Sequence, residues 1–85
     1  MLKIKTLSLD VLKPSDLPTV DLMKELEKSN GVTKIDITLV EFERNTDTLK
    51  VGIEGTGLNI DEITKCIASF GGVIQNIEHI VAEKV

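Results

Sequence analysis

The order of secondary-structure patterns along this chain constrains its fold more than any other feature. Two segments with helical periodicity interrupt four strand-like segments, in the order strand–helix–strand–strand–helix–strand. This order is typical of the split βαβ motif, in which four antiparallel strands form one sheet. The sequence therefore predicts an α+β, ferredoxin-like βαββαβ sandwich, with spatial strand order 4-1-3-2 and both helices on one face.

Prolines, glycines and a capping pattern mark where these segments end. Pro14 cannot donate to a strand ladder, and Pro18 suits the first turn of a helix. Gly31 tolerates the left-handed conformation at a helix C-terminus, and Asn59 with Glu62 resembles a capping box. The predicted segments are strand 2–12, a helix from 18 or 19 to 30, strand 32–44, turn 45–48, strand 49–54, helix 59–70 and strand 73–82.

One face of each predicted element supplies the core. The apolar phase of the second strand changes near Val40 and Phe42, which indicates a bulge or a second buried surface. Elsewhere, alternation in the strands and helical spacing in the helices define a single stripe. The residues predicted to be deeply buried are Leu7, Leu9, Val11, Leu26, Ile37, Val51, Ile63, Ile67 and Phe70.

Length and composition limit the class of protein. Residues 1–85 suffice for one domain, and 41% apolar with 28% charged residues is typical of a globular protein. The net charge of −4 argues against a nucleic-acid binder. No apolar run approaches the ~18 residues of a membrane span, and residues 1–5 lack the apolar core of a signal peptide. We therefore expect a cytoplasmic protein.

The single cysteine and the single histidine offer little chemistry. Cys66 alone cannot form an intramolecular disulfide or a thiolate metal cage, and its place beside the apolar stripe of the second helix favours a core position. His79 has no partner histidine and is interpreted as a surface or edge-strand residue. The segment 54–59 lacks the third glycine of a dinucleotide fingerprint and the Lys-Ser/Thr of a P-loop, so it is interpreted as a turn.

Acidic side chains gather on the sheet face opposite the helices, which we call the open face. Alternation places one carboxylate from each strand there: Asp10, Asp36, Glu54 and Glu78. Carboxylate oxygens suit a hard cation such as Ca²⁺ or Mg²⁺, or a polyamine. These four residues are the candidate metal ligands, and the competing interpretation is a solvated face whose acids do not converge.

Apolar residues are also predicted on the open face. A monomer rarely exposes such a set together, so we expect a homo-oligomer that uses this face or the sheet edges. The residues are Ile4, Leu12, Val40, Phe42, Ile74 and Ile80.

Several short strings, in order and spacing, resemble the small archaeal domain-of-unknown-function 211 family across nearly the whole chain. The resemblance implies a ferredoxin-like fold, an archaeal origin, ring-like or other homo-oligomers, and no assigned activity or catalytic residue. Gln75 and His79 depart from the family pattern, which has a histidine and an acid at these places. The matching strings are 9–14, 31–32, 36–38, 51–55, 61–63, 71–74 and 77–78.

The leading functional hypothesis is a non-enzymatic binding or assembly module without catalytic residues or a certain cofactor. The alternative is a regulatory domain that binds a small effector between subunits. An acylphosphatase-like enzyme needs an arginine cradle after the first strand, but the chain's only arginine is Arg44. An RNA-recognition motif needs aromatic residues on its central strands, and a heavy-metal chaperone needs Cys-x-x-Cys, which are both absent. A nucleotide-exchange module of the elongation-factor type shares the topology without any specific motif.

Overall fold

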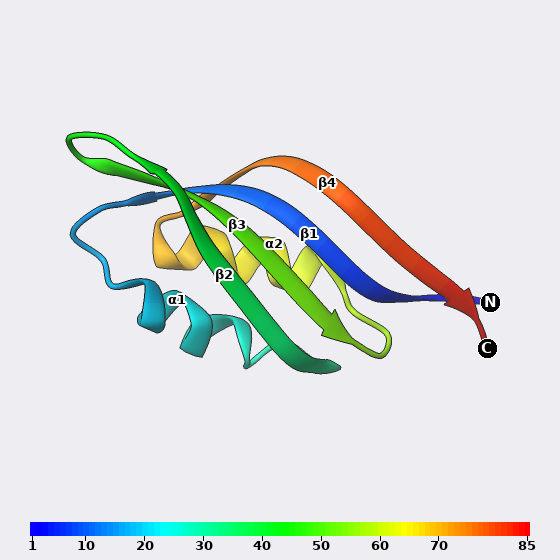
Figure 1. Ribbon diagram of the computed structural model, residues 1–85. Coiled ribbons are helices and arrows are strands. Elements are labelled where there is room, and N and C mark those ends of the chain that lie inside the picture. The colour runs from blue at the N-terminus through cyan, green and yellow to red at the C-terminus, as the bar shows by residue number, and fades with distance from the viewer.

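The fold is a four-stranded sheet covered on one face by two helices. The computed structural model describes residues 1–85. The strands are ordered β2-β3-β1-β4 and all pair antiparallel, and both helices lie on the same side of the sheet (Figure 1). Neither helix is long and apolar enough to cross a membrane. The predicted sandwich and strand order are confirmed, with elements β1 (Leu2–Pro14), α1 (Thr19–Leu26), β2 (Val32–Phe42), β3 (Thr46–Gly55), α2 (Ile60–Phe70) and β4 (Val73–Lys84).

Eleven buried apolar side chains fill the space between sheet and helices. Ile37 and Phe70, predicted to be deeply buried, are only half-buried and pack at the margin of the core. Ile37 lies on the edge strand β2, and Phe70 is the last residue of α2, so neither is covered on all sides. The buried set is Leu7, Leu9, Val11, Leu22, Leu26, Leu49, Val51, Ile53, Leu58, Ile63 and Ile67.

A bulge in β2 explains the change of apolar phase. The β2–β3 register shifts between Leu39 and Glu41, which leaves Val40 as an extra residue. Beyond the bulge Phe42 pairs with Asp47, which is two residues from the inward-facing Leu49. Phe42 therefore lies on the helix side of the sheet, although it extends past the helices and is exposed. The predicted bulge is confirmed, and the predicted place of Phe42 on the open face is wrong.

Further register shifts between β1 and β4 move three more residues off the open face. Ile4 precedes a shift and packs against the core. Ile74 pairs with Val11 and Ile80 with Leu7, and both partners face the helices. Because paired residues point to the same face, Ile74 and Ile80 lie on the helix side as well. Of the apolar set expected on the open face, Leu12 is the member whose pairing keeps it there.

Two connections differ in detail from the prediction. The hairpin turns at residues 44–45 rather than 45–48, because the Glu43 and Thr46 backbones exchange hydrogen bonds of 2.8 and 3.4 Å. The first helix ends at Leu26, and a turn leads on to Gly31, whose φ is +86°. The capping interaction of α2 is confirmed, since Asn59 Oδ1 accepts a hydrogen bond from the Glu62 amide at 3.0 Å.

Truncating Ile67 to alanine should destabilise the fold by about 2–5 kcal/mol, because the side chain is fully buried and its loss leaves a cavity. Urea denaturation followed by circular dichroism measures the change. Val20→Ala on the exposed side of α1 is the control and should change the free energy of unfolding by less than about 0.5 kcal/mol. Equal midpoints for Ile67→Ala and the parent would contradict this description of the core.

Candidate functional site

The centre of the open face joins charged side chains from three strands. Asp10 of β1 pairs with Lys50 of β3. The Lys50 Nζ lies 2.9 Å from the Glu78 Oε1 of β4, so the lysine reaches across β1. A single ammonium group thus pairs with Glu78 two strands away and lies close enough to Asp10, on the strand between, to feel its charge.

This arrangement shifts the pKa values of two of its members. The hydrogen bond with Glu78, helped by the charges of Glu78 and Asp10, raises the pKa of Lys50. The hydrogen bond with Lys50, followed by the contact with Asp10, lowers the pKa of Glu78. Both shifts favour the charged forms, so the cluster is an ion-pair network at neutral pH.

A bulge brings Glu78 into this cluster. The residues on either side of it, Ile77 and His79, pair with Leu9 and Ser8, which are consecutive in β1. Glu78 is therefore the extra residue of β4, and its side chain extends to Lys50.

The four candidate carboxylates do not form one cluster. Asp36 pairs with Gly52, and the Glu54 Oε2 lies 3.6 Å from the Lys34 Nζ. No group of three or more His, Cys, Asp or Glu side chains in the chain is placed to hold a metal ion. The structure thus brings Asp10 and Glu78 together around a lysine, and it leaves Asp36 and Glu54 outside that arrangement. Binding of Ca²⁺, Mg²⁺ or a polyamine there stays a prediction.

A buried ion pair at the end of β1 was missed by the sequence reasoning. The Lys13 side chain is 1% exposed, and its Nζ lies 2.8 Å from the Asp47 Oδ2. The same ammonium donates to the Leu17 carbonyl at 2.6 Å and the Pro14 carbonyl at 3.0 Å. The alternation of β1 could have predicted the burial of Lys13, because this residue continues the inward-facing positions 7, 9 and 11. This pair ties β1 to the start of β3 and to the loop before α1.

Cys66 and His79 lie on opposite sides of the sheet. Burial, followed by the charges of Glu25 and Glu62, raises the pKa of the Cys66 thiol, which keeps it protonated and weakly nucleophilic. Cys66 is half-buried and packs at the margin of the core rather than in its centre. His79 is exposed and pairs with Ser8 on the open face, as expected for an edge-strand histidine.

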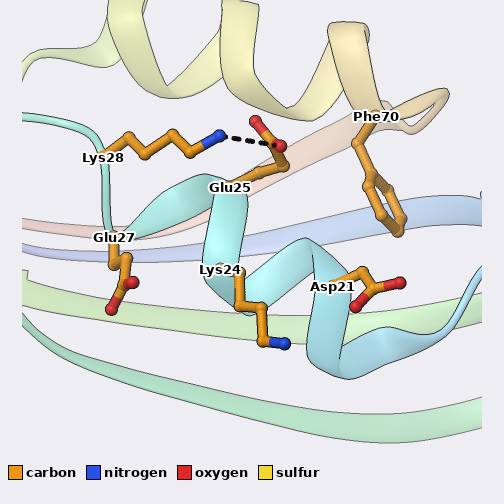
Figure 2. A pocket seen from close by; sticks show the side chains of 6 residues that line it. All are labelled: Asp21, Lys24, Glu25, Glu27, Lys28 and Phe70. Carbon is orange, nitrogen blue, oxygen red and sulfur yellow. Dashed lines mark hydrogen bonds and ion pairs between the residues drawn. The ribbon is translucent and has the colours of Figure 1, made fainter.

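The largest hollow lies along α1 rather than on the open face. It measures about 550 Å³ and is lined by five charged residues of α1 and its C-terminal turn together with Phe70 of α2. Figure 2 shows the Phe70 ring reaching toward α1 and Lys28 paired with Glu25, while Lys24 and Glu27 lie on the other side of the helix. The side chains do not converge on a common point, so this hollow is a solvated groove beside the helix.

Removing Lys50 should strengthen cation binding at Asp10 and Glu78. In Lys50→Ala, Asp10 and Glu78 lose their counter-ion and should repel each other. Millimolar Ca²⁺, Mg²⁺ or spermidine should then raise the melting temperature more for Lys50→Ala than for the parent. Parallel melts of Asp10→Asn are the control. A Ca²⁺-dependent increase in the parent that Asp10→Asn abolishes would contradict this view and favour a cation site in the native chain.

Comparison with known proteins gives a relationship over almost the whole chain. The DUF211 family model, described as "Uncharacterized ArCR", matches residues 5–85. An uncharacterized protein of Methanocaldococcus jannaschii is 37% identical over 81 residues, which cover 95% of this chain and 84% of that protein.

Proposed function

This chain belongs to the DUF211 family of uncharacterized proteins, and from that premise we propose a non-enzymatic module that assembles with copies of itself through the outer edge of β4. The observation that carries the proposal is the length and exposure of this edge. The strand has 12 residues and only one neighbour in the sheet, β1. In Figure 1 it forms one margin of the molecule along its whole length.

A long, exposed edge strand of this kind is a template for strand pairing. Its outward amide and carbonyl groups have no partner within the sheet. Ten of the twelve residues of β4 are exposed, and none is a proline. Proteins that stay monomeric usually shorten or charge such an edge, whereas β4 has only two acids and one lysine.

Exposed apolar side chains of β4 also support its role as the interface. Ile77 and Ile80 are 41% and 47% exposed, although they pair with the fully buried Leu9 and Leu7 of β1. The helix layer therefore covers β1 but not the adjacent part of β4. A second subunit that extends the sheet from β4 would bury this apolar strip and satisfy the outward backbone groups together.

Within one chain, the geometry favours assembly over cation binding. The Lys50 ammonium already pairs with Glu78 beside Asp10, so a divalent cation that bound both carboxylates would have to displace it. An effector site between subunits, the alternative function, requires the same interface to exist first. Assembly is therefore the step to test before either ligand.

Native mass spectrometry and light scattering test this proposal. We expect the parent to contain more than one subunit at micromolar concentration, and Ile80→Lys to be a folded monomer. Val20→Lys places the same charge on the outside of α1 and should leave the assembly intact. A parent that is monomeric across concentrations would overturn the proposal.

One further variant identifies the partner edge. Phe42 is 73% exposed and ends β2, the other edge strand of the sheet. Phe42→Glu should dissociate the assembly if β4 of one copy meets β2 of the next. It should leave the assembly intact if two β4 edges pair with each other, as in a two-fold dimer.

A further inference from the structure

We propose that Asn30, in the turn between α1 and β2, is the site at which this protein deamidates, and that the reaction loosens the attachment of β2. The Gly31 backbone nitrogen attacks the Asn30 side-chain carbonyl carbon, and ammonia leaves with the amide nitrogen. The resulting succinimide then takes up one water molecule. Opening at one carbonyl gives aspartate, and opening at the other gives isoaspartate, whose main chain passes through the former side chain.

The neighbouring residue distinguishes Asn30 from the other asparagines. The chain contains four, at positions 30, 45, 59 and 76. The residues that follow the last three are Thr46, Ile60 and Ile77, which are all β-branched and crowd their own amide nitrogen. Gly31 has no side chain, so its nitrogen is the least hindered of the four nucleophiles.

The local structure leaves both reacting groups available. Asn30 and Gly31 are exposed. Gly31 lies outside the helices and strands, and its N–H donates no hydrogen bond within the protein, whereas the Thr46 N–H donates to the Glu43 carbonyl. The attacking nitrogen at Asn30 is thus free of a bond that would have to break first.

The product fits poorly into the surrounding structure. The Gly31 carbonyl accepts a hydrogen bond from the Thr56 N–H at 3.0 Å, and the backbones of Gly31 and Gly55 touch closely. Isoaspartate inserts one more main-chain carbon immediately before Gly31, which displaces this contact. The contact holds the start of β2 against the end of β3, so we expect β2 to loosen there.

The new charge acts in the same direction. The Asn30 N–H donates to the Glu62 Oε1 at 3.1 Å, and the buried Ser29 hydroxyl donates to the same oxygen at 3.3 Å. A carboxylate at position 30 would lie near this acid, and two like charges close together are unfavourable. Both products should therefore be less stable than the original chain.

Incubation of the folded parent in mildly alkaline buffer, below its melting temperature, tests the proposal. Intact mass should rise by about one dalton per reacted chain, peptide mapping should place the gain at Asn30, and isoaspartyl methyltransferase should label that peptide. Asn30→Gln keeps a side-chain amide but must close a larger ring, so it should lose this mass gain. The aged fraction should melt at a lower temperature than the fresh protein.

Three outcomes would overturn the proposal. In the first, another asparagine gains the extra mass at an earlier time than Asn30 does. In the second, the folded protein stays unmodified at Asn30 while a urea-unfolded sample reacts there, which would show that the fold protects the site. In the third, the modified chain melts like the parent, which would refute the loosening of β2.

Discussion

Replacing Lys13 with methionine should lower the free energy of unfolding by about 1–3 kcal/mol, because two carbonyl oxygens lose the donor that the buried ammonium supplies. Methionine preserves most of the stem but cannot donate to Asp47, Leu17 or Pro14. Both carbonyl oxygens then lose a charge-assisted hydrogen bond in an enclosed site. Urea denaturation of the two proteins measures the difference.

A second lysine pair provides a matched control. The Lys28 Nζ lies 3.1 Å from the Glu25 Oε1, a geometry similar to that of the buried pair, but the lysine side chain is 67% exposed. Lys28→Met should therefore change stability by less than about 1 kcal/mol. Similar effects of the two substitutions would show that burial of Lys13 does not matter to the fold.

Acid titration gives an independent measure of the same pair. The hydrogen bond from Lys13 lowers the pKa of Asp47 below its ordinary 3.8, with a smaller contribution from Ser15. A carboxyl group whose pKa is lower in the folded state stabilises above its unfolded pKa, and this contribution is lost as pH falls through the folded pKa. The parent should thus lose part of its stability below about pH 4, and Lys13→Met should lose less over that range.

The order of elements and the inward stripe of β1 could be predicted from the sequence, because alternation reports burial directly. The register of β4 could not be predicted in the same way. Ile74, Ile77 and Ile80 follow each other at intervals of three and all pair with inward-facing residues. Each interval contains one extra residue, and a shift of one residue reverses the face of everything that follows. A simple two-residue period therefore put two of these isoleucines on the wrong face.

The candidate site was predicted in composition but not in arrangement. Alternation predicted the carboxylates on one face, but it did not predict that a lysine of the same chain is the counter-ion of one of them. The contact of Lys50 with Glu78 across β1 depends on the bulge at Glu78, which alternation does not reveal. Lys13 was missed for the opposite reason, since a lysine in an inward register was treated as the end of the strand. The family resemblance is confirmed, but it names no activity.

Replacing Gly55 with alanine should cost more than about 4 kcal/mol, which is beyond the range of most single substitutions. A Cβ on Gly55 would lie 1.9 Å from the Gly31 carbonyl oxygen and 2.8 Å from its carbon. The opposing atoms belong to the main chain and cannot move by a change of rotamer. The same contact carries the hydrogen bond from Thr56 that joins the α1–β2 turn to the end of β3. Relief therefore requires the two segments to separate.

Gly52, three residues earlier in the same strand, supplies the comparison that isolates this cause. A Cβ there would meet Asp36 atoms at 3.6 and 3.7 Å, which is ordinary van der Waals contact. Gly52→Ala should be neutral or stabilise by about 0.4–1 kcal/mol, because alanine restricts the unfolded chain without strain. Urea denaturation of both variants separates backbone crowding from the general effect of adding a methyl group to β3. A Gly55→Ala protein as stable as Gly52→Ala would mean that the turn after α1 yields easily, and that β2 is not held by this contact.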